Sequence, residues 1–490
     1  MTAIADVRED VRLPPFARTY AGGIAAATTL LLLAVSPWYG YHRDELYFRL
    51  LGEHPKIGYF DTPPLTPMIA RVSTALFGDT VVALRVVPAL CTGALIVLIA
   101  LMARELGGDR SAQVLAAAGT ATGLLPLVGG HTLLTLTPDL VLWTTVVVML
   151  LRVLLRGDGR YWPAIGLVSG VATYNRDLIV MLLASVGVGV LVAGPRRIFA
   201  DRRLWLGALI AVVVAAPNLI YQMTHGWPQF QMAAALGADD GANNRVTFVP
   251  LQILLLGVPQ FVIGIAGWRR LWRNRATRAP AIAYPVACAF TLYSGGRPDY
   301  VGAFLLYLFA AGCVSAAGWR LRGLTVGALA VSGALMAVVA LPVVPAASLD
   351  GSPVATINEV ARESVGMHDV ADQVAWVVRT LSPTDRAQAV LLAGNYGEAG
   401  AFDRWAGDFG LPKVYSGHNE LWWWGPPPET ARVVVAVNYD ERFLSARFAR
   451  CSTAGSLHGM PGEEDGVPIV VCHDPLRPWR EMWPDMRHYS

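Results

Sequence analysis

The chain has 490 residues, of which 54% are hydrophobic and only 15% are charged, and its formal net charge is +3. This composition is too apolar for a soluble globular protein of this length and predicts a membrane protein. The basic residues are scattered over several connections, which argues against a nucleic-acid-binding surface, and the five cysteines form no CxxC pair.

The chain begins with a charged stretch that contains Arg8, Arg12 and Arg18, and an apolar run over residues 20–38 follows it. No A-x-A cleavage site ends this run. We therefore expect an uncleaved first transmembrane helix rather than a signal peptide.

Apolar runs long enough to cross a membrane recur along the first 346 residues. A helical span needs about 20 apolar residues, and this rule predicts about eleven transmembrane helices. The predicted runs are 20–38, 80–103, 112–128, 138–155, 161–174, 178–193, 204–222, 247–268, 280–294, 300–317 and 324–346. The two runs between 161 and 193 are shorter than this rule requires.

Arginines mark every second connection between these runs. The Arg-rich connections are 103–110, 152–160, 194–203, 268–278 and 319–323. Because cytoplasmic loops are enriched in Lys and Arg, this pattern predicts a cytoplasmic N-terminus. The remaining connections, which are 39–79, 129–137, 175–177, 223–246 and 295–299, then face outward.

The composition changes after the last run, and residues 347–490 are expected to form a small external α/β domain beside a membrane domain of residues 1–346. Buried strands are predicted at 389–394, 432–437 and 468–472, with helices over 358–380 and 440–448. An odd number of spans places this domain outside the cytoplasm.

Four outward connections carry charged and polar side chains to the same membrane face. These side chains are His42, Arg43, Asp44, Glu45, Lys56, Tyr59, Asp61, His131, Asp139, Asn175, Arg176, Asp177, Arg297, Asp299 and Tyr300. Each one alone could snorkel at a helix end. Asp44 could also cap a surface helix, and Asp139 could be a first-turn carboxylate after Pro138. Together they suit a reaction at the interface, because a carboxylate can deprotonate a hydroxyl while Arg and Lys bind a phosphate.

Several motifs resemble those of the bacterial dolichyl-phosphate-mannose-protein mannosyltransferase-like family, which also includes the lipid A aminoarabinose transferases. They are "RDELYF", "GYFDTPPL" and "GDTVVALRVVPAL" in the first outward connection, "TPD" in the second, "HGWPQF" at 225–230, and "NYGEAGAFDRW" with "GLPKVYSGHNELWWWGP" in the tail. The resemblance implies the C-type glycosyltransferase fold.

The resemblance also implies an activity. Members transfer a sugar, with inversion, from a polyprenyl phosphate to an acceptor outside the cytoplasm. Asp44 falls on the motif that supplies the base, Glu45 is its supporting residue, and Asp139 matches the acidic position that orients the acceptor or a basic partner. Thr62 stands where aminoarabinose transferases carry Lys, which speaks against lipid A as acceptor. Arg176 replaces a Lys of many members and keeps its charge.

The other site predictions follow from this assignment. Arg176, Arg297 and Lys56 are predicted to bind the donor phosphate. The predicted substrate-binding residues are His42, Arg43, Tyr59, Asp61, His131, Asp299 and Tyr300. No cofactor is required and no His/Cys cluster predicts a metal, although a divalent metal ion is compatible with the reaction. The partners are a polyprenyl-phosphate-linked sugar, an envelope acceptor and the bilayer, without nucleic acid.

A secondary transporter is the alternative reading, since a bundle of about eleven spans would suit it. Transporters place coupling charges near the bilayer midplane in repeated halves, whereas these runs are nearly free of Asp and Glu and show no internal repeat.

Two features of the tail lead to further expectations. The tryptophans of "ELWWWGPPP" (420–428) could stack on a sugar, rest at the headgroup level of the membrane, or pack the tail domain onto the membrane domain. Cys451 and Cys472 are the only cysteines outside apolar runs, and an external location predicts a disulfide between them. Two separate buried thiols are the alternative.

Overall fold

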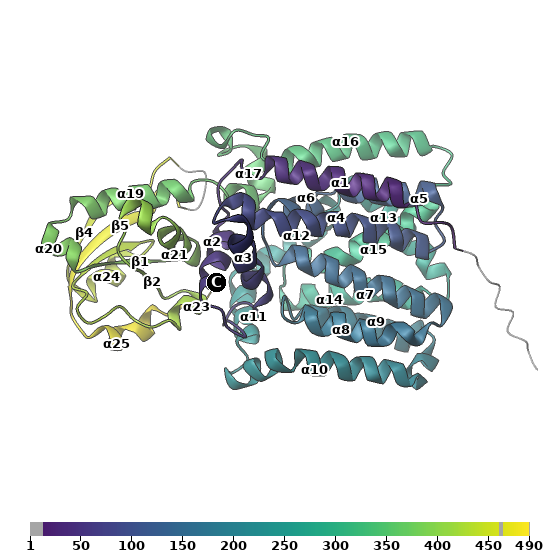
Figure 1. Cartoon of the computed structure of the whole chain (residues 1–490), viewed down its shortest axis with the longest axis horizontal. Helices are drawn as coiled ribbons and strands as arrows, with labels where there is room; N and C mark the ends of the chain where they lie inside the picture. Colours follow the sequence, from purple (N-terminus) through teal and green to yellow (C-terminus); the bar gives the residue numbers. More distant parts are fainter. Residues whose placement is uncertain (1–12, 460–463, 490) are drawn as a thin grey trace, which may run out of the picture.

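The computed structural model describes residues 13–459 and 464–489. Long helices form a bundle, and a smaller region with a five-stranded sheet lies at one end of it (Figure 1). This arrangement confirms the predicted fold class, a polytopic helical protein with a small C-terminal α/β region. The predicted charged stretch with Arg8 and Arg12 lies outside the described residues.

Every predicted apolar run coincides with one helix or with a bent pair of helices. In chain order these are α1 (Arg18–Val35), α4 (Val81–Glu105), α5 (Arg110–Ala121) with α6 (Leu124–His131), α7 (Leu136–Arg156), α8 (Trp162–Ala172), α9 (Ile179–Ala193), α10 (Arg202–Thr224), α12 (Gly241–Leu254) with α13 (Val258–Arg273), α14 (Arg278–Ser294), α15 (Gly302–Ala316) and α16 (Arg322–Ala340). Within the described ranges, six helices are long and apolar enough to cross a membrane, or up to eight if each bent pair is one span. The chain is a multi-pass membrane protein, and the number eleven stays a prediction.

The run predicted at 247–268 is not one straight helix. Helices α12 and α13 meet at 92°. Gly257 separates them with a φ of +104°, a conformation that favours glycine, and Pro259 stands in the first turn of α13. These two residues end one helix and start the next in a new direction.

The connections gather at opposite ends of the bundle. At the Arg-rich end, Arg152 binds Glu105 at 3.0 Å and Arg270 donates to the carbonyl of Leu106 at 3.3 Å. At the other end, the backbone N–H of Leu65 donates to the carbonyl of Tyr174 at 2.8 Å. The alternation predicted from the arginines therefore corresponds to two distinct ends, and the sheet region lies at the end that is poor in arginine loops.

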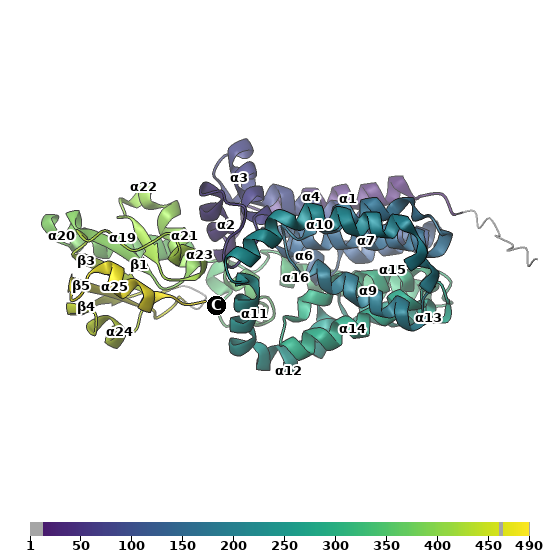
Figure 2. The same cartoon turned by 90° about the horizontal axis from the view of Figure 1, so that it is seen from below.

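The first outward connection folds into α2 (Arg43–Glu53) and α3 (Leu65–Phe77), which lie between the bundle and the sheet, as Figures 1 and 2 both show. Helix α2 starts with a capping box: the Nδ1 atom of His42 accepts from the N–H of Asp44, and the Glu45 carboxylate accepts from the N–H of His42, each at 3.0 Å. The N-cap is His42, so the capping role considered for Asp44 is wrong. Asp139 does lie in the first turn of α7, as expected.

The sheet has the order β2-β1-β3-β5-β4. Its strands are β1 (Ala389–Ala393), β2 (Val414–Ser416), β3 (Val433–Val437), β4 (Phe448–Ser456) and β5 (Pro468–Pro475). Strand β1 runs parallel to β2 and β3, whereas β5 is antiparallel to β3 and β4. The three predicted strands are confirmed. The short β2 and the exposed β4 lack a continuous apolar run, and for this reason they were not predicted.

Two predicted helices of the tail are shorter than expected. Gly366, at a φ of +98°, separates α18 (Glu359–Arg362) from α19 (Met367–Thr380). Helix α24 (Glu441–Ser445) ends before strand β4, so Cys451 lies in a strand and not after a helix. Cys451 and Cys472 are register partners on β4 and β5, and a disulfide joins them.

Helix α2 contributes to the hydrophobic core of the sheet region. Its residues Leu46 and Leu51 are fully buried in one cluster with Leu391 of β1 and Val374 of α19. The first outward connection is therefore packed from both sides, by the bundle and by the sheet region, although about 300 residues separate it in sequence from the latter.

Candidate active site

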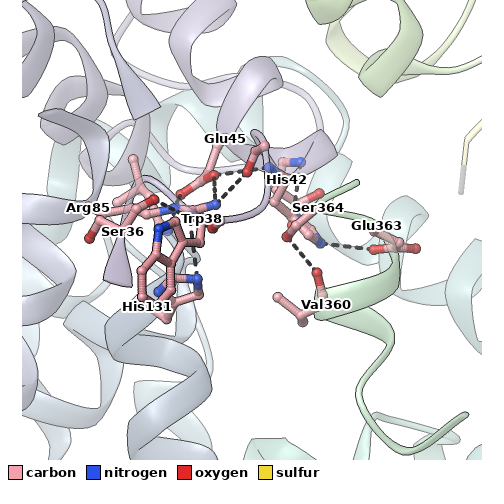
Figure 3. A network of polar contacts seen from close by, with 12 residues as sticks. Ser36, Trp38, His42, Glu45, Arg85, His131, Val360, Glu363 and Ser364 are labelled. Carbon is pink, nitrogen blue, oxygen red and sulfur yellow. Dashed lines mark hydrogen bonds and ion pairs between the residues drawn. The ribbon is translucent and has the colours of Figure 1, made fainter. Parts of the chain in front are cut away.

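A buried ion pair lies at the start of α2 (Figure 3). Glu45 and Arg85 are both fully buried, and the Arg85 guanidinium donates to both carboxylate oxygens at 3.0 and 2.9 Å. Glu45 also accepts from the N–H of Leu133 at 3.0 Å. Arg85 further donates to the carbonyls of Ser36 and Gly40 at 2.9 and 2.7 Å. The pair thus fixes α2 against α4 and the second outward connection, and Glu45 supports the site without facing a substrate.

Two predicted substrate-binding histidines belong to this same network. His42 and His131 are only 2% and 4% exposed. The Nε2 atom of His42 lies 2.9 Å from the carboxylate of Glu363, and that of His131 accepts from Arg85 at 3.3 Å. Burial lowers the pKa of His42, but the bond to Glu363 and the nearby carboxylates raise it overall. Both rings therefore have buried partners within the fold, and their substrate contacts stay predictions.

Tyr59 and Lys56 also have partners within the protein. Tyr59 is fully buried, and its hydroxyl donates to the carbonyl of Leu51 at 3.0 Å. The Lys56 ammonium lies 2.5 Å from the carboxylate of Glu420, which also accepts from the N–H of Phe60 at 2.8 Å. Tyr59 therefore closes a turn. Lys56 ties the first connection to α23 (Asn419–Trp422), but its side chain is 43% exposed, and its phosphate contact stays a prediction.

Asp44 and Asp61 each accept a hydrogen bond from a tyrosine. The hydroxyl of Tyr396 donates to Oδ1 of the half-buried Asp44 at 2.9 Å, and that of Tyr47 donates to Oδ1 of Asp61 at 2.8 Å. The two rings pack with centroids 4.7 Å apart. Burial raises the pKa of Asp61 to about 7. Arg43, another predicted substrate residue, lies 5.7 Å from the centroid of Tyr396.

A second cluster joins the third and last outward connections with the start of α7. Arg176 and Arg297 both face Asp299, with nitrogen–oxygen distances of 3.7 and 3.2 Å. The Arg176 guanidinium lies 5.3 Å from the ring centroid of Tyr300. Asp139 is 6% exposed and interacts electrostatically with Arg176 and Asp299. The side chains of Arg176 and Arg297 are 21% and 57% exposed, so each is partly accessible.

Hydrogen bonds connect the outward loops to one another. Asn175 accepts from the Thr66 hydroxyl at 2.9 Å and donates to the carbonyl of Thr135 at 2.7 Å. Leu133, which donates to Glu45, lies only two residues before Thr135. The second outward connection therefore links the Asp44 side of the site to the arginine side, and the predicted carboxylates and arginines come together at one end of the bundle.

Sequence reasoning missed Arg85, Glu363 and Tyr396 as members of this region. Arg85 did carry a signal, because an ionisable residue inside an apolar helical run is rare and usually paired. Tyr396 carried none, because 352 residues separate it from Asp44. In the described ranges, no group of three or more His, Cys, Asp or Glu side chains is arranged to hold a metal ion.

The tryptophans of the tail motif pack the sheet region onto the first connection. Trp424 lies 4.4 Å from the ring of His54, and Trp423 lies 5.9 Å from that of Phe60. The indole N–H of Trp422 donates to the carbonyl of Trp483 at 2.9 Å. These contacts agree with the packing alternative, although Trp423 is still 45% exposed.

Comparisons with known proteins agree with this architecture. Residues 61–221 match the model of the dolichyl-phosphate-mannose-protein mannosyltransferase family. The undecaprenyl phosphate-alpha-4-amino-4-deoxy-L-arabinose arabinosyl transferase 1 of Pseudomonas fluorescens is 27% identical over 276 residues, which cover 51% of this chain and 49% of that protein. The match thus spans about half the length of this curated relative.

Solved structures match over a larger part of the chain. ArnT from Cupriavidus metallidurans bound to undecaprenyl phosphate superimposes with a TM-score of 0.59 at 17% identity, covering 92% of this chain and 97% of that one. Its apo state gives a TM-score of 0.58 at 15% identity, with the same coverage. The chain therefore has the C-type glycosyltransferase fold that its motifs indicated, and part of its sequence is similar to the dolichyl-phosphate-mannose-protein mannosyltransferase family.

Proposed function

We propose that this protein transfers a sugar from a polyprenyl-phosphate donor to a hydroxyl group of an envelope acceptor, with inversion. One observation carries the proposal: two partly exposed arginines and the carboxylate of Asp299 lie together on outward connections of the bundle. A phosphate on a lipid tail would reach such a site from the bilayer. The name of the Pseudomonas fluorescens relative and the undecaprenyl phosphate bound in the ArnT crystal structure support this donor class.

The proposed reaction has one base and one leaving group. Asp44 takes the proton from the acceptor hydroxyl, whose oxygen attacks the anomeric carbon from the face opposite the phosphate. The bond between that carbon and the phosphate oxygen breaks, and polyprenyl phosphate leaves. Arg176 and Arg297 stabilise its negative charge. Asp139, close to Arg176, orients this guanidinium, while Asp61, Arg43, Asp299 and Tyr300 are proposed to contact the substrates.

The sugar and the acceptor of the relatives are not part of the proposal. Thr62 occupies the position where aminoarabinose transferases carry a phosphate-binding Lys, and this difference speaks against lipid A. Purified protein in liposomes should release polyprenyl phosphate from a polyprenyl-phosphate sugar, and mass spectrometry of co-purified lipid should identify that sugar. Absence of transfer from any such donor would refute the function, and assays with EDTA would test for a metal.

We also propose that the Arg-rich end faces the cytoplasm, and that the sheet region lies outside it. The positive-inside rule supports this orientation. The Cys451–Cys472 bridge supports it too, since disulfides persist in oxidising compartments. The site would then lie at the outer face of the cytoplasmic membrane.

Neutralising either arginine is expected to weaken donor binding. Arg176→Gln and Arg297→Gln each remove a charged donor from the proposed phosphate site, which should lower donor affinity by about tenfold or more. Binding of a fluorescent polyprenyl-phosphate sugar would measure this. Arg196→Gln is the matched control, because Arg196 lies in an Arg-rich connection and bonds only to the Leu191 carbonyl among the described residues. Unchanged affinity in both site variants would place the phosphate elsewhere.

The bridge between Cys451 and Cys472 is expected in protein purified without reductant. Alkylation and mass spectrometry should find both sulfurs protected until the protein is reduced. Reduction should lower the free energy of unfolding of the sheet region by about 3 kcal/mol, because a loop of roughly 20 residues is released. Cys91, Cys288 and Cys313 are unbridged and serve as internal controls. Two freely alkylated thiols would contradict both the bridge and the external location.

A further inference from the structure

The sheet region touches the proposed base directly. Tyr396 is the first residue of α21 (Tyr396–Arg404), which follows strand β1, and its hydroxyl donates to Oδ1 of Asp44 at 2.9 Å. The other carboxylate oxygen, Oδ2, has no hydrogen bond to any described residue. One oxygen of the base is therefore held by the sheet region, and the other is available to a ligand.

The glycines of the "NYGEAG" motif explain how α21 comes so close to α2. A Cβ atom on Gly400 would lie 2.8 Å from the backbone carbonyl carbon of Leu46, and one on Gly397 would lie 2.6 Å from the Cβ of Arg43. No larger residue fits at either position without moving the helices apart. An ion pair between Arg49 of α2 and Asp403 of α21, at 2.9 Å, holds the same two helices together further along.

Tyr396 itself is rigidly placed. Asn395 and Glu398 form a capping box at the start of α21. The backbone N–H of Tyr396 donates to Nδ1 of His418 at 3.2 Å, and the two rings pack with centroids 5.0 Å apart. Strand β1 lies between the parallel strands β2 and β3, so Tyr396 stands at their carboxyl edge, where sheets of this kind present functional residues.

We infer that Tyr396 is a positioning residue for the proposed transfer: its hydroxyl holds Oδ1 of Asp44 and thereby directs Oδ2 toward the acceptor hydroxyl. This inference rests on the proposed function. The proton of the acceptor passes to Oδ2, and Tyr396 keeps its own proton throughout. The sheet region is then part of the active site and not only an attached domain.

The charged surroundings of Asp44 come from three segments. His42 on its own helix end accepts from the Asp44 N–H, Arg43 pairs with Glu363 at 2.9 Å, and Tyr396 comes from α21. Only Tyr396 donates from a side chain to the Asp44 carboxylate among these groups. Because this donor stabilises the charged form of the carboxylate, its removal should move the acidic limb of the pH–rate profile to higher pH.

The test is Tyr396→Phe in the full-length protein, with Tyr439→Phe as the matched control. Tyr439 also lies in the sheet region, and its hydroxyl donates to the carbonyl of Ala393 at 3.4 Å. For Tyr396→Phe, kcat should fall by about ten- to a hundredfold, the range for a hydrogen bond to a charged group, while KM for the donor stays unchanged. The acidic limb should shift as described. The control should change neither quantity.

Two results would overturn the inference. One is a wild-type rate and pH profile in Tyr396→Phe. The other is a lower rate with an unshifted profile and a lower unfolding temperature, which would mean that Tyr396 only docks the domains. A fluorinated tyrosine at position 396 gives a readout without turnover: its ¹⁹F signal should titrate with Asp44 and lose that titration in Asp44→Asn. If this titration is seen but no sugar is transferred, the contact stands and the proposed function fails.

Discussion

Asp44→Asn is expected to fold, to bind donor and to transfer sugar at least about 100-fold more slowly than the wild type. The amide is the same size as the carboxylate and can still accept from Tyr396, but it cannot take a proton from the acceptor. Folding should survive because the start of α2 depends on His42, Glu45 and Arg85. Initial rates at saturating donor, together with donor affinity and unfolding temperature, separate chemistry from binding and stability.

Asp408→Asn is the control for this substitution. Asp408 lies on α22 (Ala406–Phe409) in the sheet region, with a side chain that is 65% exposed and 3.7 Å from Arg404. Removing this exposed charge should leave the rate unchanged, since such surface pairs contribute little. A folded Asp44→Asn protein that turns over like the wild type would exclude Asp44 as the base and leave Asp61 as an alternative carboxylate.

The helices of the bundle could be predicted because a membrane-spanning helix is recognisable from its local composition. A run such as 138–155 must be apolar over its whole length, and it must satisfy its backbone hydrogen bonds internally, so composition alone locates α7. Strands β1, β3 and β5 could also be predicted from local composition, because each is buried on both faces and is therefore a short apolar run. Strand β4 is mostly exposed and has no continuous apolar run, so it could not be predicted in this way.

The site was predicted only in part, because residue type does not reveal which way a side chain faces. His42, Tyr59 and His131 have suitable chemistry, yet they satisfy buried partners of the fold. The capping box of α2 shows the same limit. Both His42 and Asp44 precede an apolar helix, and the choice between them depends on Glu45 reaching back to the N–H of His42.

Contacts between segments that lie far apart in the sequence could not be predicted. The core formed by α2 with β1 and α19 joins parts of the chain that local periodicity treats separately. In the sequence, Tyr396 was only one residue of a tail motif. Its contact with Asp44 depends on two glycines that let α21 approach α2. A polar residue in such a motif acquires a role only when the tertiary structure provides its partner.

Breaking the pair between Glu45 and Arg85 is expected to have the largest effect on stability. In Arg85→Met, the Glu45 carboxylate stays fully buried and keeps only two backbone donors, those of Leu133 and His42. An uncompensated buried charge typically lowers the free energy of unfolding by about 3–5 kcal/mol. Glu45→Gln should also destabilise, because the Arg85 guanidinium then lacks its counter-charge.

The double variant Glu45→Gln/Arg85→Met distinguishes a paired charge from two independent groups. It should be more stable than the sum of the single effects indicates, since neither charge is left unpaired. Unfolding by denaturing detergent would give the four free energies. Arg160→Met is the matched control, because the Arg160 side chain is 79% exposed and its pair with Asp158 lies at the surface. If Arg85→Met were no less stable than this control, the buried pair could not be what fixes the start of α2, and with it the position of Asp44.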